Sequence, residues 1–177
     1  MAAAKDALLV VDMQVGLFAG TPKHDAAGLV ERLNGLARRI RASGGRIVFV
    51  RHTAPDGDFR EGTPGWQLLP ELEVEDGDAL IAKSTCDSFA GTELAALLPP
   101  GATSRLIVTG CATDFCVDTT VRSAAIRGYQ VWAPSDGHTV ADRPHLSASQ
   151  IIAHHNYVWS DFIAPRGPIR VTPIAEI

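Results

Sequence analysis

The fold follows from one stretch, Ser104-Arg-Leu-Ile-Val-Thr-Gly110 and then Cys111-Ala-Thr-Asp-Phe-Cys116-Val-Asp-Thr-Thr120. Its first half is a short apolar run with β-branched residues that stops at a glycine, which is typical of a buried strand. Its second half opens a helical pattern, because the apolar residues after the second cysteine are spaced to share one helix face. The stretch therefore predicts a buried strand that leads directly into a helix, with Thr113 or Asp114 as the N-cap.

Cys116 falls in the first turn of this predicted helix, near the second or third helical position. The unpaired N–H groups and the positive dipole end of a helix favour a thiolate over a thiol. The position therefore suits a nucleophile. A buried structural cysteine is the alternative interpretation, because free cysteine is among the most buried residue types.

Apolar runs and amphipathic segments alternate along the rest of the chain. The expected strands cover 7–11, 46–50, 79–82, 105–109, 129–133 and 169–172. The expected helices cover 25–43, 92–98, the segment after Cys116 and 145–157. Strands that are apolar throughout and separated by helices indicate a parallel sheet covered on both faces. We therefore predict a three-layer α/β/α fold, a doubly wound six-stranded parallel sheet in the order 3-2-1-4-5-6, forming one domain over 1–177.

The composition is that of an ordinary globular protein, with 177 residues, 46% of them hydrophobic, 20% charged, and a net charge of −4. Mild acidity without a Lys/Arg cluster argues against nucleic acid or an anionic membrane as the partner. The first apolar run has only five residues, too few for a signal peptide or a membrane span. Three cysteines without regular spacing fit a reducing compartment, so a cytoplasmic location is expected.

Three chemically capable residues follow strands of the predicted sheet. Asp12 ends the first strand, Lys83 ends the third, and Cys116 lies just beyond the fourth. Ligands of open α/β sheets bind outside the carboxyl ends of the strands, so these side chains are expected at one edge. There Asp12 could take the thiol proton, while Lys83 holds Asp12 and stabilises the thiolate. The alternative is an Asp12–Lys83 salt bridge that only shapes the edge.

The chain resembles the isochorismatase-like cysteine hydrolase superfamily, which includes nicotinamidases and N-carbamoylsarcosine amidohydrolases. The matching stretches follow the family's order over nearly the whole chain: Leu8-Leu-Val-Val-Asp12-Met-Gln14, Gly62-Thr-Pro-Gly-Trp66, Lys83-Ser-Thr-Cys-Asp-Ser-Phe89, Val108-Thr-Gly110 through Thr120, Gly128-Tyr-Gln-Val131 and Ile152-Ala-His-His-Asn156. The resemblance implies a catalytic triad of Cys116, Asp12 and Lys83. It also implies an oxyanion hole from the backbone N–H groups of Ala112 and Cys116, a cis peptide between Cys111 and Ala112, and a homo-oligomer.

The resemblance has one departure, at the end of the second strand. Nicotinamidases carry a metal site there, built from an Asp-x-His pair and a later His. This chain has Val50-Arg-His52-Thr53, and no further His before His138. A single His with Asp56 and Asp58 nearby is a weak zinc site, since zinc favours several well-placed nitrogen or sulfur ligands. We therefore expect no metal and no cofactor, which argues against nicotinamidase activity.

The segment 52–78 interrupts the alternation of strands and helices with many Pro and Gly residues. Long loops inside compact domains are usually functional, so we expect this one to form a wall of the site. Four aromatic residues near the mapped catalytic segments are candidates for lining a substrate pocket: Phe18, Trp66, Phe89 and Phe115. Cys86 and Cys111 are expected to be small core residues.

The sequence favours a metal-independent hydrolase acting on a small molecule. Cys116 would attack an amide, carbamoyl or ureido carbonyl, an amine or ammonia would leave, and water would release the acid from a thioester. Isochorismatases proper lack the nucleophilic cysteine. A non-catalytic small-molecule binder or scaffold on the same fold is the alternative, and iodoacetamide alkylation of Cys116 ahead of Cys86 and Cys111 would argue against it. A nucleotide-binding protein is not favoured, because Asp12-Met-Gln-Val-Gly16 lacks a Gly-x-Gly-x-x-Gly turn.

Overall fold

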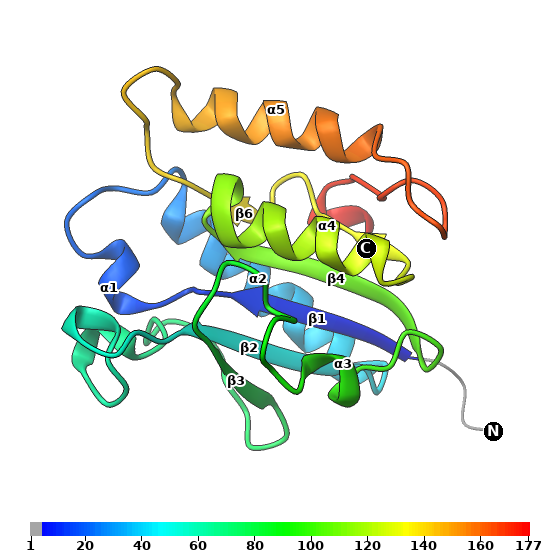
Figure 1. The fold of residues 1–177 in the computed structure, drawn as a ribbon, viewed down its shortest axis with the longest axis horizontal. Helices are drawn as coiled ribbons and strands as arrows, with labels where there is room; N and C mark the ends of the chain where they lie inside the picture. Colours follow the sequence, from blue (N-terminus) through cyan, green and yellow to red (C-terminus); the bar gives the residue numbers. More distant parts are fainter. Residues whose placement is uncertain (1–4) are drawn as a thin grey trace.

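A computed structural model describes residues 5–177 and shows a parallel sheet with helices on both faces (Figure 1). The strands are β1 (Lys5–Val11), β2 (Arg46–His52), β3 (Ala79–Lys83), β4 (Thr103–Cys111), β5 (Val131–Trp132) and β6 (His138–Thr139). The α-helices are α1 (Val15–Phe18), α2 (Ala26–Ala42), α3 (Leu94–Leu97), α4 (Asp118–Ile126) and α5 (Ala148–Ser160). Short helical turns are η1 (Gly57–Phe59), η2 (Pro64–Trp66), η3 (Thr113–Val117) and η4 (Ile174–Glu176). Within this part of the chain no helix is both long and apolar enough to cross a bilayer.

The sheet confirms the predicted α/β class and most of the predicted strand order. Its strands run β3-β2-β1-β4-β5, with every pair parallel, and β6 pairs with β4. The predicted sixth strand, 169–172, lies parallel beside β5: the Arg170 N–H donates to the Val131 carbonyl and the Arg170 carbonyl accepts from the Ala133 N–H, both at 2.9 Å. It amounts to a single bridge between Arg170 and Trp132 rather than a full strand. After the short β5, a turn at Pro134–Gly137 returns the chain to the carboxyl end of β4. There the Gly110 N–H donates to the Gly137 carbonyl at 3.0 Å.

Helices cover both faces of the sheet, which explains why its strands are apolar throughout. Helix α4 lies in front of the sheet in Figure 1 and α2 lies behind it. Side chains of a strand alternate between the two faces. In β2, Val48 and Val50 accordingly pack in the core with α4, whereas Ile47 and Phe49 pack in the core with α2.

The glycine that stops the apolar run of β4 is required by the approach of β1. Gly110 has φ +119°, and a Cβ added there would lie 2.1 Å from the Val11 carbonyl oxygen. Any other residue would clash with the backbone of β1 at this point. The close approach sets the start of η3 beside the residue that follows β1, Asp12.

The last helix begins later than predicted, because its N-terminus is fixed by a capping box. The Ser147 hydroxyl accepts a hydrogen bond from the Gln150 N–H, and the Gln150 side chain accepts one from the Ser147 N–H. These reciprocal bonds satisfy two N–H groups that a helix end leaves unpaired. The helix therefore starts at Ala148 rather than near residue 145.

Candidate active site

Lys83 joins the two other strand-end residues into one cluster. Its Nζ donates to Asp12 Oδ2 at 2.7 Å and lies 3.2 Å from Cys116 Sγ. A third bond runs from Nζ to the Thr85 carbonyl at 3.0 Å. An ammonium group has three N–H donors, so these three partners use all of them and fix the orientation of the Lys83 ammonium group. The three residues predicted to meet at the sheet edge are therefore in contact.

The Asp12–Lys83 ion pair is removed from solvent, since the two residues are 1% and 2% exposed. Burial acts to lower the pKa of Lys83, but the charge of Asp12 and the hydrogen bonds to Asp12 and Cys116 outweigh it and raise that pKa. The lysine is therefore a permanent cation. Asp12 Oδ1 is also buried, and it has no hydrogen-bond partner within residues 5–177.

Asp12 occupies a strained backbone conformation at the end of β1. Its φ is +50°, in the left-handed region that few residues other than glycine adopt. Its N–H donates to the Val50 carbonyl at 2.8 Å, which holds the residue beside β2. Such strain costs about 1–3 kcal/mol and is concentrated at functional sites.

Cys116 lies in a π-helical turn, not in the first turn of an α-helix as predicted. The turn η3 has Ala112 as its N-cap, and α4 begins only at Asp118. The Val117 N–H donates to the Ala112 carbonyl at 3.2 Å, which closes a ring one residue wider than an α-helical one. The expected N-cap at Thr113 or Asp114 is therefore wrong. The peptide bond between Cys111 and Ala112, just before this turn, is cis.

Two sets of side-chain bonds anchor η3 to the rest of the protein. Arg143 donates two hydrogen bonds to the Asp114 carboxylate, both of 2.8 Å. On the buried side, Thr113 Oγ1 lies 2.9 Å from His138 Nδ1, and His138 Nε2 lies 3.0 Å from Asn156 Oδ1. Burial lowers the pKa of His138 to about 4, so this imidazole is a neutral structural link at pH 7. Sequence reasoning did not find this chain of contacts.

The surroundings of Cys116 raise the pKa of its thiol, in the opposite direction to the expected effect of a helix N-terminus. Burial raises the pKa of Cys116 most, and the charge of Asp12 raises it further. Lys83 acts in the opposite direction but does not compensate for both. The arrangement is that of a thiol beside a base, in which proton transfer accompanies attack on a carbonyl.

The other two cysteines have opposite environments. Cys111 is buried as predicted, and burial raises its pKa to about 12. Cys86 is exposed, so its assignment to the core is wrong: it lies in an irregular loop after β3. An exposed thiol also competes for iodoacetamide with the buried Cys116 thiol. The predicted order of alkylation therefore does not follow, and reactivity of Cys116 has to be measured in a Cys86→Ser background.

Two of the four candidate pocket aromatics are near the cluster or in the 52–78 loop: Phe115 and Trp66. Phe115 directly precedes the cysteine and is 55% exposed, with the Arg143 guanidinium 5.2 Å from its ring centroid. Trp66 is only 7% exposed. Its ring stacks with Arg51 at 3.5 Å, and its Nε1 donates to Thr53 Oγ1 at 2.8 Å. Trp66 thus holds the 52–78 loop against β2, and little of its ring is free for a ligand.

The other two candidates pack in the core, and their part in a substrate pocket stays a prediction. Phe89 is a core residue whose ring centroid lies 5.4 Å from that of Tyr129, beyond the C-terminal end of α4. Cys116 lies before the N-terminal end of the same helix. Phe18 packs on the opposite face of the sheet, where it borders a hollow of about 410 Å³ beside α2.

His52 is a member of the edge that sequence reasoning considered only as a metal ligand. It pairs with Lys83 in the β2–β3 ladder, and Gln14 holds its backbone through bonds of 2.7 Å to the N–H and 3.0 Å to the carbonyl. His52 Nδ1 is buried without a hydrogen-bond partner in the described chain. Nowhere in residues 5–177 do three His, Cys, Asp or Glu side chains gather as a metal site requires.

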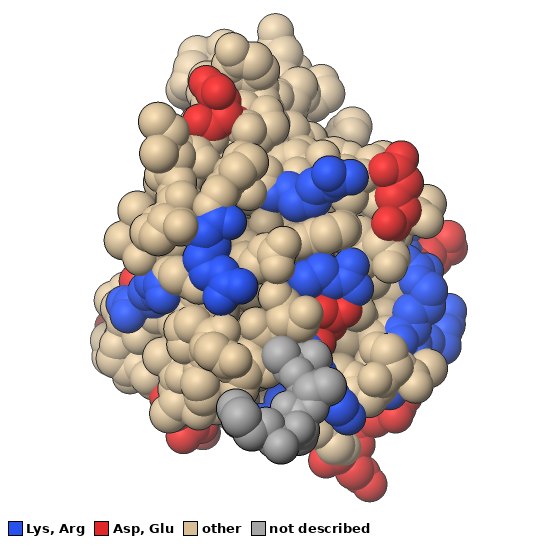
Figure 2. All heavy atoms as spheres, turned by 90° about the vertical axis from the view of Figure 1, so that its right-hand side faces the viewer, with Lys and Arg blue, Asp and Glu red and all other residues tan. Residues whose placement is uncertain are grey.

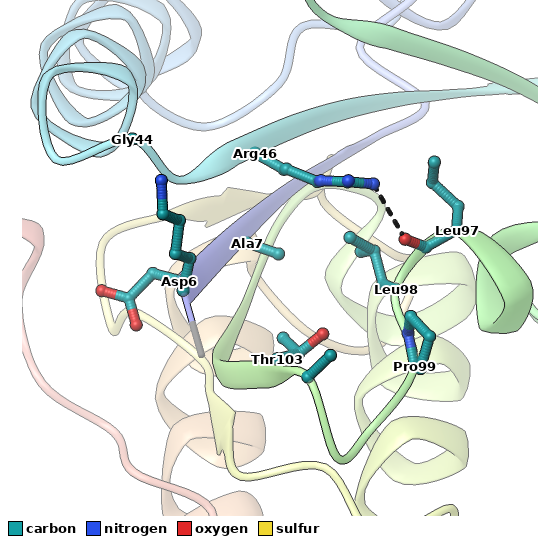
Figure 3. A pocket seen from close by; sticks show the side chains of 10 residues that line it. Asp6, Ala7, Gly44, Arg46, Leu97, Leu98, Pro99 and Thr103 are labelled. Atoms are coloured by element: carbon teal, nitrogen blue, oxygen red, sulfur yellow. Dashed lines mark hydrogen bonds between the residues drawn. The ribbon is translucent and has the colours of Figure 1, made fainter. Parts of the chain in front are cut away.

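A separate hollow of about 360 Å³ opens at the opposite, amino-terminal edge of the sheet (Figure 3). It is bordered by Lys5, Asp6 and Arg46 at the starts of β1 and β2, and by Leu97 to Pro99 at the end of α3. Figure 2 shows this face of the molecule, where Lys and Arg side chains lie among Asp and Glu side chains. The hollow is far from the carboxyl ends of the strands, where open α/β sheets bind their ligands. It is therefore not part of the candidate site.

Replacing Lys83 with methionine is expected to slow alkylation of Cys116 by iodoacetamide at least about tenfold at pH 7. The reason is the loss of the one cation that favours the thiolate. The pH dependence of alkylation, followed by peptide mass in a Cys86→Ser background, measures this effect. Lys5→Met, which removes an exposed lysine at the far edge, is the control and should not alter the profile. An unchanged profile in Lys83→Met would leave the lysine with a structural role only.

Comparison with known proteins places these features in a family. The model of the isochorismatase domain matches residues 6–155. A streptothricin hydrolase of Streptomyces noursei is 35% identical over 140 residues, and the ureidoacrylate amidohydrolase RutB of Stutzerimonas stutzeri is 24% identical over 160 residues. These alignments cover 78% and 69% of this chain but only 51% and 64% of the relatives. A solved structure of an isochorismatase family protein is 31% identical, with a TM-score of 0.84, over 97% of this chain and 98% of its own.

Proposed function

We propose that this chain, which belongs to the isochorismatase family, hydrolyses a C–N bond of a small amide, carbamoyl or ureido compound through a thioester on Cys116. The observation that carries the proposal is the position of Lys83, whose Nζ contacts Asp12 Oδ2 and Cys116 Sγ at once. An Asp12–Lys83 salt bridge with a purely structural role would not require the additional contact between Lys83 and the Cys116 thiol. Two relatives support cleavage of this kind of bond, one named a streptothricin hydrolase and one a ureidoacrylate amidohydrolase.

In the proposed reaction Asp12 takes the proton of the Cys116 thiol as Sγ attacks the substrate carbonyl carbon. The backbone N–H groups of Ala112 and Cys116 are proposed to stabilise the resulting oxyanion. Asp12 then returns the proton to the nitrogen, the C–N bond breaks, and a thioester remains. Water attacks the thioester with Asp12 as the base, which releases the carboxylic acid and restores the thiol. Lys83 stays protonated and keeps Asp12 in place throughout.

The proposed site needs no metal. The donor set at the edge consists of one carboxylate, one imidazole, one thiol and a lysine ammonium. A cation between Asp12 and Cys116 would occupy the position that the Lys83 ammonium already holds 2.7 Å and 3.2 Å from them. The three cysteines are free thiols, which supports the expected reducing, cytoplasmic setting. A single catalytic domain and a homo-oligomer remain part of the proposal.

A screen of small amides, carbamoyl compounds and ureides for release of ammonia or amine tests the function. We expect at least one class to be hydrolysed by the wild-type chain, with no added metal and in the presence of a chelator. Binding without turnover of every compound would favour the alternative of a small-molecule binder on this fold. Loss of activity on chelation would contradict the metal-independent reaction.

A further inference from the structure

The turn η3 is held at both ends by residues of α5, a helix that runs alongside α4 (Figure 1). At the start of the turn, Thr113 contacts His138, and His138 contacts Asn156 of α5. Just after its end, the Asp118 carboxylate accepts a hydrogen bond from Trp159 Nε1 at 2.7 Å. Asn156 and Trp159 are three residues apart, so they lie on one face of α5. A helix that contributes nothing to the proposed triad therefore contacts the turn on both sides of its cysteine.

The hydrogen bonds of the first contact have fixed directions. Asn156 Nδ2 donates to the Ser135 carbonyl at 2.9 Å, which leaves Asn156 Oδ1 as the acceptor that faces His138. His138 Nε2 therefore carries the ring proton and donates it. The imidazole is neutral, since burial lowers its pKa to about 4, so Nδ1 has no proton and accepts the Thr113 hydroxyl. The hydroxyl of Thr113 is thus directed at one atom of a buried ring.

His138 is itself firmly placed beside the turn. It belongs to β6 and pairs there with Gly110 of β4, the strand that leads into η3. It is only 4% exposed. Its ring packs edge-on against Trp159, with the ring centroids 4.9 Å apart. A hydrogen bond to so rigid a group fixes the position of Thr113.

The turn transmits the position of Thr113 to the proposed nucleophile. Thr113 begins η3, and Cys116 lies three residues further on, inside the one turn that the Val117 N–H closes on the Ala112 carbonyl. At the far side of the turn, Cys116 Sγ meets Lys83 Nζ at 3.2 Å. A displacement of about 1 Å at a reacting group can lower a rate about a hundredfold. The placement of the turn therefore bears directly on the reactivity of the thiol.

We propose that His138 is a positioning residue for the proposed hydrolysis, because its bond to Thr113 holds η3 so that Cys116 stays against Lys83. This inference rests on the proposed function and adds to it a residue outside the triad. The alternative is a buried link that contributes only to the free energy of unfolding. Loss of such a link would lower the melting temperature and leave the rate per folded molecule unchanged.

Thr113→Val tests the role of the link, because it removes the hydroxyl and keeps the shape of the side chain. We expect kcat for the best substrate of the screen to fall at least about tenfold, with KM changed by less than about twofold. Thr113→Ser keeps the hydroxyl and should restore most of kcat. Thr109→Val is the matched control. It removes a buried hydroxyl that donates to the Leu9 carbonyl at 2.7 Å, so it should lower the melting temperature without changing kcat.

Variants of His138 test the other side of the same bond. His138→Leu removes the acceptor and should lower kcat as Thr113→Val does. His138→Asn places an amide oxygen near the position of Nδ1 and should retain more of kcat than His138→Leu. Combining Thr113→Val with His138→Leu should cost no more than the more severe single variant, because the two residues act through one bond. Melting temperatures show which variants are folded.

Hydrogen–deuterium exchange tests the link without a substrate. In Thr113→Val the amides of residues 112–117 should exchange at least about tenfold faster than in the wild type, whereas Thr109→Val should leave them unchanged. Unchanged kcat in folded Thr113→Val, or unchanged exchange, would overturn the positioning role and leave the thioester reaction in place. If the wild type hydrolysed no compound of the screen, the proposed function would fail, and the exchange rates would still decide whether His138 holds the turn.

Discussion

Cys116→Ala is expected to reduce hydrolysis of any cognate amide at least about a thousandfold without unfolding the protein. A nucleophile acts as part of a unit, so its removal abolishes the covalent route and leaves only the contribution of the bound, oriented substrate. The fold should survive, because the side chain is half-buried and its polar contact is a single bond from Lys83, which keeps its bonds to Asp12 and Thr85. Ammonia release and thermal melting measure the two parts of this expectation.

Two further variants sharpen this test. Cys116→Ser keeps the shape of the site but offers a poorer nucleophile, so it should be nearly as inactive as the alanine variant. Cys86→Ser removes the exposed thiol and should retain full activity. More than a few per cent of wild-type activity in Cys116→Ala would contradict a thioester mechanism and favour direct attack by water.

The three residues of the proposed triad could be found from sequence because each follows a strand. Asp12 and Lys83 end apolar runs, Cys116 follows a third, and parallel strands bring their carboxyl ends to one edge. The glycine before the cysteine could be found for a related reason. Gly110 must lack a side chain because β1 passes against it, and a break in an apolar run is visible in the sequence.

The features that sequence reasoning missed have no signature in the residue pattern. The π-helical turn that carries Cys116 is set by the Ala112 carbonyl, which accepts from both Phe115 and Val117, and its residue pattern does not differ from that of an α-helix. The His138 link joins Thr113 to Asn156, across 25 and 18 residues of sequence. Neither Thr113 nor Asn156 belongs to a residue pattern that would indicate this contact.

The positions of aromatic side chains in the folded protein also could not be read from sequence. Phe89 is near Lys83 in sequence, but its ring lies against Tyr129 in the core. The state of Cys116 was also misjudged. The helix N-terminus was expected to favour the thiolate, whereas burial and the Asp12 charge raise the pKa of the thiol. Electrostatics at this site are dominated by one carboxylate and by desolvation, which sequence position does not report.

Asp12→Asn is expected to reduce hydrolysis about a thousandfold or more while accelerating alkylation of Cys116. The amide keeps the shape of the carboxylate but has no basicity, so the proton of the thiol has no acceptor during attack and none is returned to the leaving nitrogen. The same change removes the negative charge that raises the pKa of Cys116, while the Lys83 cation remains 3.2 Å from Sγ. The thiolate then replaces the carboxylate as the counterion of the buried ammonium.

This pair of effects distinguishes a base from a structural partner. The pH profile of iodoacetamide alkylation in a Cys86→Ser background should move to lower pH in Asp12→Asn and to higher pH in Lys83→Met. Asp56→Asn, an exposed position in the 52–78 loop, should change neither activity nor profile. If Asp12 served only to hold Lys83 in place, its replacement would disorder the cation and slow alkylation as Lys83→Met does. Opposite shifts in the two variants require that Asp12 and Lys83 act on the thiol with opposite signs, as an acceptor of its proton and as the counterion of its anion.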